Sequence, residues 1–113
     1  MDDFFLINSL FLGVGLLYVG LSLPLIAEKI KPNNWYGFRT AKTLSSPRIW
    51  YPANKAMGYD LLIAGSVVSV TALVILTTGR SLGLVPAGII NGVVLLLTLA
   101  VAVLHSFSVL RRL

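Results

Sequence analysis

Residues 28–58, EKIKPNNWYGFRTAKTLSSPRIWYPANKAMG, form the polar stretch around which the rest of this chain is arranged. Both tryptophans lie in this stretch, and so do six of the nine Lys and Arg residues: Lys29, Lys31, Arg39, Lys42, Arg48 and Lys55. On either side of it the sequence is apolar over lengths that suit a lipid bilayer. We therefore interpret it as the one substantial aqueous or interfacial segment of a small membrane protein.

The composition agrees with this class of protein. Of the 113 residues, 57% are hydrophobic and 12% are charged, whereas roughly a quarter of the residues of a soluble domain are charged. The absence of cysteine excludes disulfides, thiolate metal sites and a cysteine nucleophile. One histidine and four acidic residues do not favour a zinc or di-iron cluster, so we expect no metal and no cofactor. We attribute the net charge of +5 to orientation in the membrane rather than to direct nucleic-acid binding.

The first apolar run, Phe4 to Ala27, contains 24 residues without a charge. A bilayer core of roughly 30 Å needs about 20 helical residues, so this run predicts a transmembrane helix over residues 4–27. A cleaved signal peptide would instead begin with basic residues, and Asp2 and Asp3 are acidic. We expect the helix to be retained. Gly13 and Gly20 are predicted to share a face that admits a neighbouring helix.

Two further apolar runs follow the polar stretch. Leu61 to Gly79 contains 19 uncharged residues and predicts a span over 61–79. Its small residues Gly65, Ser69 and Ala72 mark a packing face. A turn around Arg80 leads to a third span over 85–107, so these two helices are expected to form an antiparallel hairpin.

The third run contains the pair Gly88-x-x-x-Gly92, with Asn91 beside it. Such a pair packs helices closely, and its partner is either a second copy of the chain or a neighbouring helix of the same chain. Asn91 would be costly facing lipid and is predicted to point into the bundle. We therefore assign Gly88, Asn91 and Gly92 to helix packing.

These spans predict an all-α, integral membrane three-helix bundle, formed as a single domain over residues 1–113 with a polar loop over 28–60. Three crossings place eight of the nine cations on one side, because only Arg80 lies in the hairpin turn. The positive-inside tendency then places the N-terminus outside the cell, and the loop and the C-terminus in the cytoplasm. The localisation we expect is the plasma or inner membrane.

Within the loop, Ser46 and Pro47 are typical of the N-cap and the first position of a helix. We predict a short helix from there to about Met57, bent by Pro52 and lying along the membrane interface.

This loop resembles that of a known family. The matching residues are Lys31-Pro32-Asn33, Gly37-Phe38-Arg39-Thr40, Thr43-Leu44-Ser45, Trp50, Asn54 and Gly58. Followed by two spans, the pattern is similar to that of the SdpI family of membrane immunity and signal-transduction proteins. The resemblance implies a bacterial protein that binds a peptide toxin, a cytoplasmic regulator or both. It implies a binding role for the motif positions Asn33, Gly37, Arg39, Thr40, Trp50 and Asn54.

Plainer roles remain open for several of these residues. The fork of donors on Arg39 suits a carboxylate, a lipid phosphate or backbone carbonyls, but it also suits bracing of the loop. Tyr36, Trp50 and Tyr51 are also typical of aromatic anchors at a membrane edge. The lysines are expected to set topology and to touch anionic membrane lipid.

Asp60 and His105 form a second candidate site. In the predicted hairpin, Asp60 lies at the depth of Val103, so His105 is within about one helical turn of it. Ionisable groups at membrane depth are functional candidates, and a carboxylate beside an imidazole suits a proton-sensitive pair. In the alternative, both groups are hydrated and uncoupled at the interface.

We therefore expect a protein that acts by binding and is not an enzyme, since no triad, paired catalytic carboxylates or phosphate-binding loop is visible. One alternative is a small transporter, in which Asn91, Asp60 and His105 would line a polar path. Another is an accessory subunit whose glycine faces dock a larger membrane partner or form a homo-oligomer.

Overall fold

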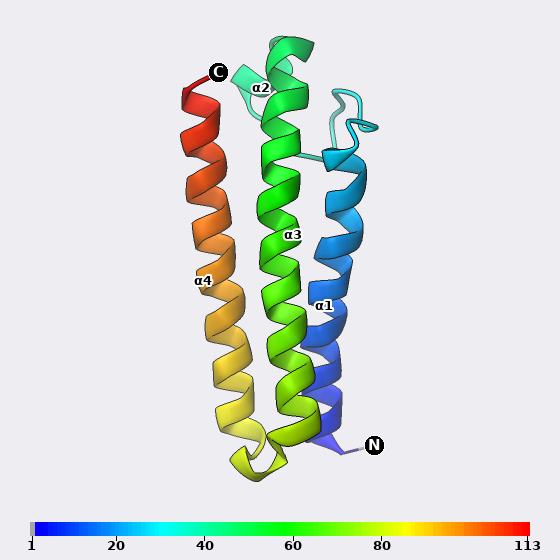
Figure 1. The fold of residues 1–113 in the computed structure, drawn as a ribbon, viewed down its shortest axis with the longest axis vertical. Helices are drawn as coiled ribbons and strands as arrows, with labels where there is room; N and C mark the ends of the chain where they lie inside the picture. The colour runs from blue at the N-terminus through cyan, green and yellow to red at the C-terminus, as the bar shows by residue number, and fades with distance from the viewer. Residues whose placement is uncertain (1) are drawn as a thin grey trace.

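The computed structural model describes residues 2–113 as a bundle of three long helices (Figure 1). They are α1 (Asp3–Ile26), α3 (Pro47–Thr78) and α4 (Leu84–Arg111). The one-turn helix α2 (Ala41–Leu44) interrupts the first connection, and the 3-10 turn η1 (Arg80–Leu82) forms the second. The helices run along a body of 51 × 22 × 19 Å, with the two chain ends at opposite ends of it (Figure 1). The predicted all-α three-helix architecture is confirmed.

The outer surface of the bundle is suited to lipid. All three long helices are long and apolar enough to cross a membrane. In the most apolar window of each helix, only 17%, 28% and 11% of the residues of α1, α3 and α4 are buried within the protein. The remaining apolar side chains face outward, which is stable in hydrocarbon and unfavourable in water. We conclude that this is a membrane protein.

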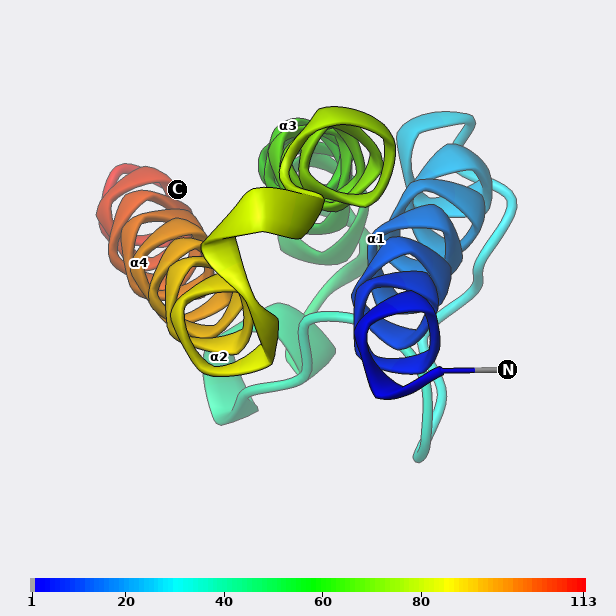
Figure 2. The same ribbon diagram turned by 90° about the horizontal axis from the view of Figure 1, so that it is seen from below.

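Helix α3 is central, and α1 packs closely against it (Figures 1 and 2). The closest approach lies at Gly15 of α1 and Gly65 of α3. A Cβ atom on Gly15 would lie 2.8 Å from the Gly65 carbonyl oxygen, and one on Gly65 would lie 2.7 Å from the Gly15 carbonyl oxygen. Both residues must therefore lack a side chain for the two backbones to come this close.

The predicted packing face of α3 is confirmed, whereas the predicted glycine face of α1 meets no other helix within residues 2–113. Gly65, Ser69 and Ala72 are all buried. Gly13 and Gly20 are exposed, and a Cβ atom on either would have no neighbour within 4 Å. Because nearly every residue of this span is apolar, hydrophobic periodicity did not indicate which of its glycines faces α3.

The prediction of a short interfacial helix that ends near Met57 is wrong. Ser46 does cap the helix, since its Oγ accepts a hydrogen bond from the Arg48 amide at 3.1 Å. The helix then continues through Gly58 to Thr78 as α3. A glycine in a helix interior costs only about 1 kcal/mol, and Gly58 is buried against Leu25 and Ile26 of α1. Tertiary packing thus outweighs the local signals for a break, and the non-helical part of the polar stretch ends at residue 46.

Polar contacts join the helices at the end that holds the N-terminus. Asp2 accepts a hydrogen bond from the Phe5 amide at 2.8 Å and pairs with Arg80 of η1 at 3.0 Å. The Phe5 amide and the Arg80 guanidinium together hold the pKa of Asp2 below its usual range. These contacts tie the start of α1 to the hairpin turn between α3 and α4.

Farther along the bundle, Asn91 of α4 points inward, as predicted. Its Nδ2 donates to Asn8 Oδ1 of α1 at 2.7 Å, and Asn8 Nδ2 donates to the Phe4 carbonyl at 2.8 Å. Gly88 and Gly92 differ, because a Cβ atom on either would meet nothing within 4 Å. Asn91 therefore packs α4 against α1, whereas the two glycines contact no other helix within residues 2–113. Their use between two chains stays a prediction.

We predict that Gly15→Ala lowers the free energy of unfolding in detergent by about 1–3 kcal/mol, because the added methyl group overpacks the contact between α1 and α3. The measurement is a denaturant titration of helix content by circular dichroism. The matched control is Gly13→Ala, two residues away in open space, which should be neutral or slightly stabilising. Equal stabilities of the two variants would contradict the packing described here.

Candidate functional site

The connection between α1 and α3 forms an ordered structure at the end of the bundle that holds the C-terminus. It passes around α1 on the side away from α3 and then crosses toward α4, where α2 lies (Figure 2). Most of the sequence-predicted motif positions lie in this connection, and the remainder lie in the first turns of α3. The structure thus gathers the residues of the predicted binding motif at one end of the molecule.

Asn33 organises the first half of the connection. Its Oδ1 accepts hydrogen bonds from the amides of Trp35 at 2.9 Å and Tyr36 at 2.6 Å. Its Nδ2 donates to the carbonyls of Lys31 at 2.8 Å and Tyr36 at 3.0 Å. One side chain thus satisfies four backbone groups, so the role that the structure shows for Asn33 is to hold the turn.

Gly37, Trp50 and Asn54 form the buried centre. Asn54 Oδ1 accepts from the Phe38 amide at 2.6 Å, and its Nδ2 donates to the carbonyls of Phe38 at 3.3 Å and Trp50 at 3.0 Å. Trp50 is 0% exposed and donates from Nε1 to the Ile30 carbonyl at 2.7 Å. Gly37 has φ +112°, and a Cβ atom there would lie 2.7 Å from Asn54 Oδ1. This centre accepts only glycine at residue 37 without strain.

Thr40 is the N-cap of α2, and two residues close to it contact α4. It forms a capping box with the buried Thr43, whose Oγ1 accepts from the Thr40 amide at 2.7 Å. Lys42 donates to the Leu110 carbonyl at 2.8 Å. Phe38 meets Phe107 edge to face, with the ring centroids 5.0 Å apart. These contacts with the last turns of α4 had no signal in the sequence, because they join residues more than sixty positions apart.

Arg39 is the exposed member of the motif. Its Nε donates to the Asn33 carbonyl at 2.8 Å, which braces the loop. Within residues 2–113, the Arg39 side chain makes no other hydrogen bond. The two Nη groups therefore keep their donors for a group outside the chain, so bracing and binding are compatible in this residue.

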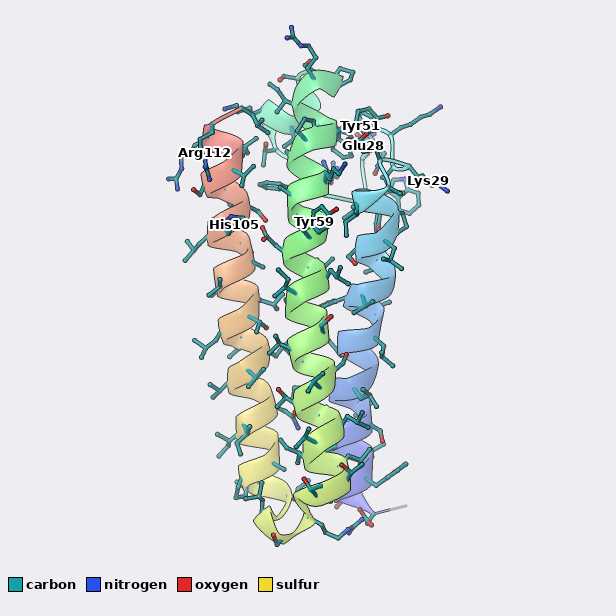
Figure 3. All side chains as sticks on the ribbon, viewed as in Figure 1. Glu28, Lys29, Tyr51, Tyr59, His105 and Arg112 are labelled. Carbon is teal, nitrogen blue, oxygen red and sulfur yellow. The ribbon has the colours of Figure 1, made fainter. Side chains whose placement is uncertain are left out.

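Asp60 and His105 lie together at the same end of the bundle, between α3 and α4. His105 Nδ1 lies 2.8 Å from both carboxylate oxygens of Asp60, and Ser106 Oγ donates to Oδ2 at 2.9 Å. Figure 3 shows His105 on α4 at about the level of Tyr59, the residue before Asp60. The Asp60 side chain is 11% exposed and that of His105 is 55% exposed. The two side chains are therefore in direct contact, as expected from the hairpin, while His105 keeps an exposed face. Their proton sensitivity stays a prediction, and Ser106 is a partner that sequence reasoning missed.

A groove of about 440 Å³ opens beside this pair, between α3 and α4. Its lining is almost entirely apolar, with Asp60 and His105 as its charged or titratable members. The other lining residues are Ile63, Ala64, Leu97, Thr98, Val101 and Ala102. Asn91 does not line it, and lies about 21 Å from His105 along α4 at 1.5 Å per residue. Asn91, Asp60 and His105 thus do not converge on one cavity, and within residues 2–113 no three acidic or histidine side chains gather as metal ligands.

We predict that Asn54→Ala loosens the connection and costs about 1–3 kcal/mol, because the buried amide of Phe38 loses its acceptor. Limited trypsin digestion in detergent micelles should cleave this variant faster after Arg39 and Lys42 than it cleaves the unaltered protein. The matched control is Asn34→Ala, an exposed asparagine of the same connection, which should leave the cleavage rate unchanged. Equal rates for both variants would show that Asn54 does not hold the loop.

The match to known proteins covers the elements just described. The family model of the SdpI/YfhL protein family matches residues 29–108, which include the connection from Lys29 onward, α3 and most of α4. Among curated proteins and among solved structures, none matches the chain. The matched segment is well over half of the 113 residues and contains every motif position on which the resemblance was based. The chain therefore belongs to the SdpI/YfhL family.

Proposed function

We propose that this protein is an immunity or signal-transducing protein of the SdpI type, which binds a membrane-active peptide, a cytoplasmic regulator or both. The observation that supports it most is the match to the SdpI/YfhL family over residues 29–108. In this proposal the protein acts by binding and catalyses no reaction.

The contrast between the interior motif positions and the exposed Arg39 supports a binding role for Arg39. The side chains of Trp50 and Asn54 are occupied by hydrogen bonds within the connection, and Gly37 leaves the space that Asn54 fills. Arg39 lies on the surface and uses only Nε in the loop. A guanidinium held by Nε presents its Nη groups as a pre-oriented fork, which suits a carboxylate or a row of peptide carbonyls.

The proposed orientation places this loop in the cytoplasm of a bacterial cell, at the plasma or inner membrane. Eight of the nine cations lie at the end of the bundle with the loop and the C-terminus, and Arg80 lies at the other end. The positive-inside tendency favours the cationic end in the cytoplasm. A cytoplasmic regulator would then have direct access to Arg39, whereas a peptide would reach it through the membrane.

One observation favours a second candidate, an accessory subunit or a homo-oligomer. Gly88 and Gly92 of α4 have open space where a side chain would be, and the neighbouring α4 surface is apolar. A Gly-x-x-x-Gly pair facing lipid admits the close approach of another helix. The transporter alternative is less favoured, because the polar groups at Asn91 and at Asp60 belong to separate contacts.

We predict that cells expressing this protein survive a set of membrane-permeabilising peptides better than cells with an empty vector, for at least one peptide. Arg39→Ala should return the lethal peptide concentration to that of the empty vector, because the exposed fork of donors is lost. The readouts are growth and membrane depolarisation. Arg48→Ala is the matched control, since Arg48 is an exposed arginine at the same end of the bundle that lies outside the motif.

Equal protein levels, and an unchanged rate of trypsin cleavage after Lys42, would show that Arg39→Ala leaves the loop structure intact. A loss of protection would then report loss of binding. Full protection by a well-expressed Arg39→Ala variant would contradict the role of Arg39. If cells that express the unaltered protein were as sensitive to every peptide as cells with an empty vector, the immunity proposal itself would be contradicted.

A further inference from the structure

A second feature of the connection lies in its first half, before Arg39. Residues 29–36 surround a shallow hollow of about 340 Å³ beside the end of α1. Its lining residues include two lysines, a tryptophan and a tyrosine. The lining residues are Lys29, Ile30, Lys31, Pro32, Asn33, Trp35 and Tyr36.

Trp35 is exposed to an unusual degree for its size. It is 85% exposed, the largest fraction among the exposed large hydrophobic residues of the described chain, whereas Trp50 is 0% exposed. Its backbone is nevertheless held in place, because its amide donates to Asn33 Oδ1 at 2.9 Å. Its indole Nε1 makes no hydrogen bond within residues 2–113, so both the ring and its donor are available to the surroundings.

Tyr36 ties this hollow back to α1, close to the end of that apolar helix. Its hydroxyl donates to the carbonyl of Leu21, five residues before the end of α1 at Ile26. At 1.5 Å per residue, that carbonyl lies about 7.5 Å below the helix end. Burial against α1 raises the pKa of the Tyr36 phenol. The loop is therefore tied back along the membrane span rather than extended into water.

The charge of the hollow is positive. Lys29 lies on the outer side of α1, near its end (Figure 3), and both Lys29 and Lys31 are exposed. The adjoining Glu28 is also exposed and offsets one of these charges. The guanidinium of Arg39 adds to the positive charge, because its Nε is bonded to Asn33, itself a lining residue. Positive charge at headgroup depth attracts anionic lipid, and an indole at that depth is stable between water and hydrocarbon.

From this geometry we propose that residues 29–36 bind the headgroup of an anionic phospholipid. The ammonium groups of Lys29 and Lys31 contact the phosphodiester, and the Trp35 ring lies at the boundary between headgroups and acyl chains. This proposal does not rest on the toxin or regulator binding proposed for Arg39 above, and the bound lipid would anchor the connection to the bilayer. The occupant is a membrane lipid and not a soluble phosphate, because Trp35 needs the adjoining hydrocarbon to bury its ring.

The test is fluorescence quenching of the full-length protein in phosphatidylcholine vesicles. A small fraction of the lipid is replaced either by brominated phosphatidylglycerol or by brominated phosphatidylcholine. Tryptophan emission should be quenched more strongly by the anionic quencher at equal mole fraction. Trp35→Phe should abolish this excess, since Trp50 is enclosed by the protein.

The Lys29→Gln/Lys31→Gln double variant should lose the preference for phosphatidylglycerol, by about fivefold for each lysine removed. Lys55→Gln is the matched control, because Lys55 is an exposed lysine at the same end that does not line the hollow. It should retain the full preference. An unchanged circular dichroism spectrum of each variant would establish that the bundle is intact.

Three results would overturn the proposal. The first is equal quenching by the two brominated lipids. The second is an excess that persists in the double lysine variant. The third is displacement of brominated phosphatidylglycerol by millimolar inorganic phosphate, which would identify a soluble anion as the occupant.

Discussion

The close approach of α1 and α3 at Gly15 and Gly65 is the contact on which the rest of the structure depends. In a bilayer, apolar side chains gain little by leaving lipid for one another, so helices associate through tight packing and polar contacts. Two glycines whose missing side chains would overlap the facing carbonyls provide that packing. The same contact fixes the height of α1 on α3, which brings Leu25 and Ile26 onto Gly58. The connection therefore begins close to the helix that carries Trp50 and Asn54.

Helix α4 is held differently, because few of its residues are buried. Polar contacts join it to the rest of the molecule at three levels. Asn91 bonds Asn8 near one end, Ser106 and His105 contact Asp60 nearer the other, and the Leu110 carbonyl accepts from Lys42 beyond them. In the low dielectric of a membrane such bonds specify which way a helix faces, since turning it would leave polar groups unpaired in lipid. The groove beside Asp60 lies between α3 and α4, where His105 and Ser106 of α4 contact Asp60 of α3.

The connection combines an interior made of backbone-satisfying side chains with an exterior that carries charge and aromatic surface. Asn33 and Asn54 occupy backbone donors and acceptors that a loop of this length would otherwise expose. With the frame provided in this way, Arg39 and Trp35 are presented to the outside from fixed backbone positions. Most motif positions thus shape the connection, and Arg39 is the exposed cation among them. Trp35, which is not one of these positions, is exposed as well. The binding role of the motif stays a prediction.

The amino-acid sequence alone determined the three spans, the end of the bundle that is cationic, the Ser46 cap and the inward direction of Asn91. The length of an apolar run, the position of charges and the cost of a polar group in lipid do not depend on which residues are neighbours in the fold. These properties can therefore be predicted from the sequence. The proximity of Asp60 and His105 also followed from the helical rise once the hairpin was assumed. Only the tertiary structure decided that Gly15 rather than Gly13 or Gly20 meets α3, that Asn8 is the partner of Asn91, and that α3 continues through Gly58. The physical reason is that a helix that is apolar all round has no hydrophobic face to set its rotation, so its rotation and its partners are decided by which backbones can come close to one another.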